Sequence, residues 1–328
     1  MKVNDTRTFG RAGFDVTLLG YGGAPIGNIF RPVPEAEAQA QIAEAWDMGV
    51  RSFDTAPMYG HGLSEHRVGH ALLTRDRDDY VLSTKVGRTL TPARRGSFDT
   101  GIWVDTPPFR ADFDYSYDAV LRQVEDSLQR MCQDRFDILY VHDVDRYTHG
   151  DAQPARFAEA LEGAFPALIR LREEGVVRAI GVGVNEADVC VDALERVDLD
   201  CILLAGRYTL LEQDPVKDLL PLAVERDVAI VLGGVLNSGI LATGAVPGAK
   251  FNYQPAPEEV LSRVRDIEKH CERHRVPLAA ARFSSPPRIR RCGNFCWAHG
   301  TARKCGRTRP GSNTRSRPNS GMTCAPRD

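Results

Sequence analysis

Four residues that could together move a proton lie close to the ends of three apolar segments. Asp54 and Tyr59 follow one such segment, Lys85 ends the next, and His142 ends the one after that. A phenol is a poor acid or base because its free pKa is about 10, but a neighbouring ammonium lowers that pKa and a carboxylate can hold the ammonium in place. A histidine opposite could hydrogen-bond the reacting oxygen. The set therefore predicts acid–base catalysis.

Each of these residues taken alone has a plainer interpretation. Asp54 could cap a turn, Tyr59 could be a half-buried loop aromatic, Lys85 a salt-bridge partner and His142 a structural histidine. The four residues together are more informative than each one alone. They all lie at or just after strand ends, and the ends of parallel strands in an α/β fold converge on one face. Their joint occurrence favours catalysis.

Alternating strands and helices must position these side chains. Strands are expected at residues 16–23, 50–53, 80–85, 136–141, 177–184, 201–205 and 228–232, and helices at 34–49, 64–73, 116–131, 154–174, 187–197, 215–226 and 257–274. Near-continuous apolar strands of this kind indicate a parallel sheet buried on both faces. We therefore expect an α/β fold, a (β/α)8 TIM barrel spanning residues 1–281, whose eighth strand–helix unit is missing or scrambled after residue 281.

A doubly wound open sheet is the alternative fold, but no G-x-G-x-x-G motif follows the first strand. Residues 87–115 are rich in proline, glycine and aromatic residues and are expected to form a long loop that contributes to substrate binding. Trp103 in this insert is a candidate substrate-binding residue. A surface lid without substrate contact is the other interpretation.

Composition sets limits on the class of protein. The chain has 328 residues, 42% of them hydrophobic and 26% charged, and this is ordinary globular composition. We expect no membrane span, because no run of eighteen apolar residues occurs. The absence of a visible signal peptide and the scattered cysteines up to Cys271 favour a cytoplasmic location.

Residues 282–328 form a basic tail that does not match the rest. They contain 11 of the 42 Lys and Arg residues and one of the 44 acidic residues, so the tail carries +10 and the remainder −12. An acidic body argues against nucleic-acid binding. A disordered basic arm remains possible for the tail, and a zinc site is disfavoured because the spacing of Cys292, Cys296, His299 and Cys305 matches no common pattern, so no metal is expected. We favour a shifted reading frame, since shifting plausible codons by one base gives text similar to a final strand and helix.

The motifs FDTAPMYGHGLSE, VLSTKVGR and DILYVHD resemble those of the aldo-keto reductase superfamily, and Asp54, Tyr59, Lys85 and His142 match its tetrad. The resemblance covers about residues 8–281 and implies an NAD or NADP cofactor lying across a barrel mouth. It also implies that Asn185 holds the carboxamide and that Tyr208 stacks on the nicotinamide. The other cofactor-binding positions that it implies are Gly22, Gly23, Gly233, Gly234, Asn237, Ser238 and Gly239.

Further motifs, among them GYGGAPIGN and YVHDVDRYTHG, resemble the branch that contains aldose 1-dehydrogenases and pyridoxal 4-dehydrogenases. The resemblance implies oxidation of the anomeric carbon of an aldose hemiacetal, of the L-fucose or D-arabinose type, to the lactone, with Tyr59 as proton acceptor. Oxidation of pyridoxal to its lactone is the alternative. A non-catalytic nicotinamide-binding regulatory subunit is an alternative of another class.

Overall fold

Eight parallel strands form a closed barrel in the computed structural model, which describes residues 3–281 and 294–298. Consecutive barrel strands pair with each other around the ring, and the predicted (β/α)8 barrel is confirmed. The strands are β3 (Leu19–Gly22), β4 (Ser52–Asp54), β5 (Val81–Val86), β8 (Ile138–His142), β9 (Ala179–Val184), β10 (Cys201–Ala205), β11 (Ala229–Gly233) and β14 (Asn294–Ala298).

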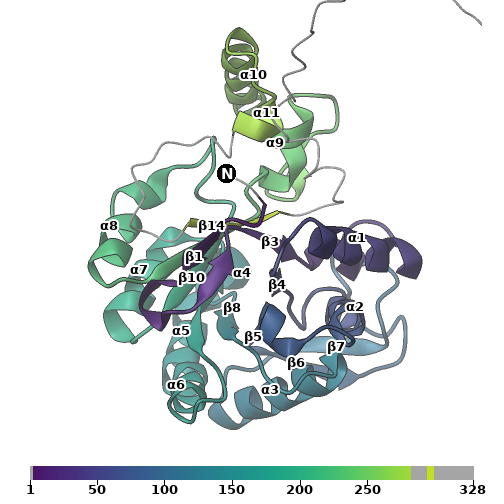
Figure 1. Cartoon of the computed structure of the whole chain (residues 1–328), viewed down its shortest axis with the longest axis vertical. Coiled ribbons are helices and arrows are strands. Elements are labelled where there is room, and N and C mark those ends of the chain that lie inside the picture. Colours follow the sequence, from purple (N-terminus) through teal and green to yellow (C-terminus); the bar gives the residue numbers. More distant parts are fainter. Residues whose placement is uncertain (1–2, 282–293, 299–328) are drawn as a thin grey trace, which may run out of the picture.

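Helices surround this barrel (Figure 1). They are α1 (Glu35–Asp47), α2 (Leu63–Leu72), α3 (Tyr117–Met131), α4 (Arg146–His149), α5 (Gln153–Glu159), α6 (Phe165–Glu173), α7 (Ala187–Arg196), α8 (Leu219–Glu225), α9 (Ile240–Thr243), α10 (Glu258–Arg273) and α11 (Leu278–Ala281). The expected helix at 154–174 is interrupted by a π-helical turn at Ala160–Ala164 between α5 and α6. Figure 1 shows α9, α10 and α11 gathered at one end of the molecule.

Strand alternation sorts the side chains into two layers. Leu82 and Val86 of β5 pack in the apolar layer with helix residues, whereas Val81 packs with Phe9 and Phe14 of the N-terminal segment inside the barrel. Because the side-chain period of a strand is two, Lys85 lies on the same face as Val81 and points into the barrel. The N-terminal hairpin consists of β1 (Thr6–Thr8) and β2 (Asp15–Thr17).

The closing strand lies in the segment after residue 281, where we expected the eighth strand–helix unit to be missing or scrambled. There β14 pairs with β11 through Val231 and Phe295 and with β3 through Gly20 and Trp297. The physical reason is that β11 and β3 would otherwise leave two open edges, and backbone pairing depends little on side-chain type. A helix after β14, and the tail cysteines other than position 296, fall outside the described residues.

The insert at 87–115 is also more regular than expected. Within it, β6 (Arg88–Pro92) and β7 (Phe109–Phe113) form an antiparallel hairpin, so the prediction of one long loop is wrong. The alternation of Phe109, Ala111 and Phe113 with polar neighbours was the sequence signal for a strand. A third hairpin, β12 (Lys250–Phe251) with β13 (Gln254–Pro255), follows β11.

Candidate active site

The four predicted catalytic residues meet at the carboxyl ends of three neighbouring strands. Asp54 ends β4, Lys85 is the fifth residue of β5 and His142 ends β8. Tyr59 lies in the loop after β4, with its ring centre 6.0 Å from that of His142. The Lys85 Nζ atom lies 4.6 Å from the centre of the Tyr59 ring. The structure therefore brings all four together.

Asp54 and Lys85 form a buried ion pair. Lys85 Nζ donates hydrogen bonds of 2.7 Å to Asp54 Oδ2 and to the backbone oxygen of Thr55. Ser83 Oγ donates to the other carboxylate oxygen of Asp54 at 2.7 Å. Burial lowers the pKa of Lys85, while the charge of Asp54 opposes this change. The ammonium is consequently fixed in position beneath the tyrosine ring.

The pKa of Tyr59 corrects one expectation. We expected Lys85 to make this phenol more acidic, but burial raises its pKa well above 10, and the negative charges of Asp54 and Asp143 add to the effect. The guanidinium of Arg88 acts in the opposite direction and does not reverse it. Tyr59 is therefore a neutral phenol at neutral pH, a form suited to donating a proton.

His142 is held as a neutral imidazole. Burial lowers the pKa of His142 well below its usual value, and the nearby charges of Arg88 and Lys85 lower it further. Its Nδ1 atom lies 3.3 Å from Arg88 Nη1, and a guanidinium only donates hydrogen bonds. Nδ1 must then be the acceptor, so the proton resides on Nε2. That N–H can donate to a substrate oxygen.

Trp103 covers Tyr59 from the insert. It is 5% exposed, and its ring centre lies 5.7 Å from that of Tyr59. A backbone bridge to Ile29 fixes its position. The buried indole Nε1 has no hydrogen-bond partner within the described part of the chain. A buried donor of this kind is costly unless something accepts from it, which fits its predicted role in substrate binding.

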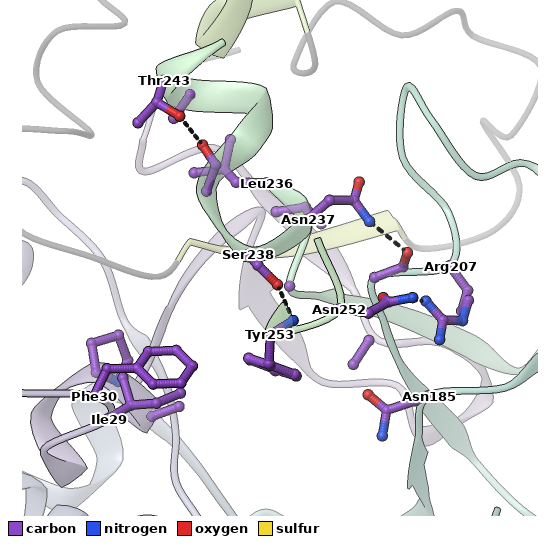
Figure 2. A pocket seen from close by; sticks show the side chains of 18 of the residues that line it. Ile29, Phe30, Asn185, Arg207, Leu236, Asn237, Ser238, Thr243, Asn252 and Tyr253 are labelled. Atoms are coloured by element: carbon purple, nitrogen blue, oxygen red, sulfur yellow. Dashed lines mark hydrogen bonds between the residues drawn. The ribbon is translucent and has the colours of Figure 1, made fainter. Parts of the chain in front are cut away.

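A cavity of about 310 Å³ is lined by five of the predicted cofactor positions (Figure 2), whereas the four catalytic residues and Trp103 are not among its lining residues. The five positions are Asn185, Gly234, Asn237, Ser238 and Gly239. The amide of Asn185 is oriented by Asp145, whose Oδ2 accepts from its backbone N at 2.5 Å and from Nδ2 at 3.4 Å. The remaining hydrogen-bonding capacity of that side chain faces the cavity.

The other four predicted cofactor positions do not line this cavity. Gly22 pairs with Asp54 in the barrel, and a Cβ atom on Gly23 would lie 2.5 Å from Ser64 Oγ, so close packing requires a glycine there. Gly233 ends β11, and Tyr208 packs against the main apolar core. Their roles in cofactor binding stay predictions.

Sequence reasoning missed the residues that span the barrel mouth. Arg207 donates to Asn252 Oδ1 at 2.9 Å, and Tyr253 N donates to Ser238 Oγ at 2.9 Å. The Tyr253 ring lies 6.2 Å from that of Phe30, and both residues line the cavity (Figure 2). Nothing in the sequence around β12 and β13 distinguishes these residues from an ordinary surface turn.

The fold and site together define a barrel oxidoreductase with a Tyr, Lys, Asp and His centre. The profile of the Aldo/keto reductase family matches residues 18–283. Pyridoxal 4-dehydrogenase of Microbacterium luteolum is 44% identical over 88% of this chain and 87% of its own. D-threo-aldose 1-dehydrogenase of a Pseudomonas species is 41% identical over 84% of this chain and 83% of its own.

The comparison with solved structures agrees with the sequence comparisons on the fold. An aldo-keto reductase from Bacillus halodurans, solved in its holo form, matches with a TM-score of 0.69 and 23% identity over 93% of this chain and 89% of its own. The chain belongs to the aldo-keto reductase family and is an NAD(P)-dependent oxidoreductase acting on CH–OH groups. Its substrates are small molecules. Within the described ranges, no helix is long and apolar enough to cross a membrane.

Proposed function

We propose that the protein oxidises the anomeric carbon of a cyclic aldose hemiacetal, of the L-fucose or D-arabinose type, to the lactone. The observation that carries this proposal is the placement of the Tyr59 phenol between Lys85 and the neutral imidazole of His142. A relative of 41% identity that is named a D-threo-aldose 1-dehydrogenase supports the choice of substrate.

The residues of the cavity fit a nicotinamide dinucleotide. Gly234 and Gly239 have φ values of +56° and +101°, and nothing lies within 4 Å of a Cβ atom built on Gly239. The backbone there can approach a ligand closely. Asn237 Oδ1 is buried and has no partner within the described residues. Together with the Asn185 amide and the Arg207 guanidinium, these groups would hold the cofactor.

The bound nicotinamide would accept the hydride that the anomeric carbon loses. Tyr59, after releasing its phenolic proton to solvent base, accepts the proton of the anomeric hydroxyl, and His142 Nε2–H donates a hydrogen bond to the same oxygen. Asp54 holds Lys85 against the face of the Tyr59 ring, and the charge of Arg88 favours the phenolate. In the reverse direction the neutral phenol of Tyr59 donates its proton to the lactone oxygen.

Pyridoxal is the second candidate substrate, since its hemiacetal undergoes the same reaction. The pyridoxal 4-dehydrogenase with 44% identity supports it. The site supports it as well, because the Trp103 ring lies 5.7 Å from that of Tyr59. Aromatic walls can stack on a flat pyridine ring.

Absorbance of the reduced nicotinamide separates these possibilities. L-fucose, D-arabinose and pyridoxal are each incubated with the protein and either NAD or NADP. We expect turnover of an aldose with release of its lactone. Turnover of pyridoxal alone would establish the second candidate. Cofactor binding without any turnover, seen as quenched tryptophan fluorescence, would instead indicate the non-catalytic subunit.

A further inference from the structure

Arg88 is a buried cation that the four-residue centre does not account for. It is the first residue of β6, three positions after Lys85, and is 6% exposed. Gly87 before it has φ of +109°, and a Cβ atom there would lie 2.4 Å from the Tyr115 ring. The chain can therefore turn sharply out of the barrel at Gly87 and bring the Arg88 side chain back over the strand ends.

Three groups hold the Arg88 guanidinium. Nη2 donates to Asp143 Oδ2 at 2.8 Å, and Nη1 lies 3.3 Å from His142 Nδ1. The guanidinium carbon lies 4.1 Å above the ring centre of Phe113, which belongs to the partner strand β7. A flat guanidinium with directed donors is defined by such contacts, and a lysine could not reproduce them.

Asp143 completes the arrangement around His142. Its second carboxylate oxygen lies 3.4 Å from His142 Nε2. Its backbone has φ of +55° and donates from N to the Gly183 oxygen at 2.9 Å. Arg88 and Asp143 are thus bonded to each other and each lies close to a different nitrogen of the same imidazole.

We propose that Arg88 is a positioning residue that keeps His142 in its Nε2–H tautomer with that N–H directed to the substrate oxygen. The inference rests on the proposed role of His142. Without the guanidinium, Nδ1 could carry the proton and Nε2 would present a lone pair to the substrate. The substrate oxygen and the Nε2 lone pair would then both be acceptors, so no hydrogen bond could form between them. Loss of the correct tautomer of a catalytic histidine can reduce turnover by up to about 10⁴-fold.

The test compares Arg88→Met with Arg88→Lys and with Arg110→Met. Arg110 lies on β7 of the same hairpin, and it is exposed and bonded only to its neighbour Asp112 among the described contacts, so its loss controls for general effects on the hairpin. We expect kcat to fall by about 10²-fold or more in Arg88→Met and less in Arg88→Lys, with unchanged cofactor Kd, and to stay within about twofold in Arg110→Met.

Nitrogen NMR of ¹⁵N-histidine-labelled protein reads the tautomer directly, with His142→Gln used to assign the signal. We expect the Nε2–H form in the parent and a mixed or Nδ1–H form in Arg88→Met. A folded Arg88→Met protein that keeps the Nε2–H form would overturn the inference. The NMR measurement needs no substrate. It therefore decides the role of Arg88 even if the proposed aldose activity is not found.

Discussion

Lys85 Nζ lies 4.6 Å from the centre of the Tyr59 ring while it donates to Asp54 and to the backbone of Thr55, each at 2.7 Å. The ammonium is thus fixed below the face of the phenol by two acceptors. The two parts of the site therefore have different functions. The Asp54–Lys85 ion pair holds a charge in place beside the ring, and Tyr59 carries the transferable proton.

Replacing Tyr59 by phenylalanine removes the group that exchanges the proton but keeps the ring. We expect kcat to fall by about 10²- to 10⁴-fold, the range for a general acid or base, with unchanged cofactor affinity. Steady-state kinetics and a fluorescence titration measure both. Tyr117→Phe is the matched control, because the Tyr117 hydroxyl contacts Arg170 at the surface. A Tyr59→Phe protein with the parent rate would exclude the mechanism.

Breaking the buried ion pair should cost stability. Lys85→Met leaves the Asp54 carboxylate buried without its counter-charge, and we expect a loss of about 3–5 kcal/mol in the free energy of unfolding. The double variant Asp54→Asn/Lys85→Met should recover part of this loss, because neither group is then charged. Urea denaturation of the single and double variants measures the coupling energy. Strict additivity of the two single changes would show that the pair is not coupled.

The rate of oxidation should rise with pH. The pKa of Tyr59 is raised, so its phenol is protonated at neutral pH, and the base form needed for oxidation increases tenfold per pH unit below that pKa. The pKa of His142 is lowered, so acid should not protonate this imidazole until well below pH 6.5. The kcat of oxidation between about pH 6 and about pH 10 measures the slope. A flat profile limited by chemistry, checked with a deuterated substrate, would contradict this assignment.

Trp103→Phe should separate binding from chemistry. The change keeps an aromatic ring beside Tyr59 but removes the buried Nε1 donor. If that donor binds a substrate hydroxyl, KM should rise by about fivefold to tenfold, the equivalent of one hydrogen bond, while kcat changes little. Trp103→Ala, which also removes the ring, should raise KM further. Equal KM values for the parent and Trp103→Phe would indicate that the indole N–H does not bind substrate.

The barrel and the meeting of Asp54, Tyr59, Lys85 and His142 could be predicted because both depend on local patterns. Apolar runs indicate where the strands lie. Residues at the carboxyl ends of parallel strands all lie on the same face of the barrel. The burial of Tyr59 and the direction in which its pKa is shifted could not be predicted. Sequence spacing identifies neighbouring charged residues but not how far the phenol is exposed to solvent.

Arg88 and Tyr253 were missed for a related reason. Arg88 is placed by its cross-strand partner Phe113 in the β6–β7 hairpin, and Tyr253 of the turn between β12 and β13 packs against Phe30. Such contacts join segments that are distant in the chain, and neither residue has an unusual type or spacing. The cofactor glycines divide in the same way: Gly234 lines the cavity, whereas Gly23 is required by packing against Ser64.

The composition of residues 282–328 leads to the last prediction, which concerns the gene. Residues 282–328 carry a net charge of +10 and show no apolar periodicity, whereas the rest of the chain carries −12. We propose that residues 282–328 are encoded in a shifted reading frame. Resequencing the 3′ end should reveal a one-base insertion or deletion. A chain with the restored frame should supply a helix that covers the closing strand, and so should have a higher melting temperature than the 328-residue chain. If protein from the native host instead has the 36.2 kDa mass of this sequence, the tail is genuine.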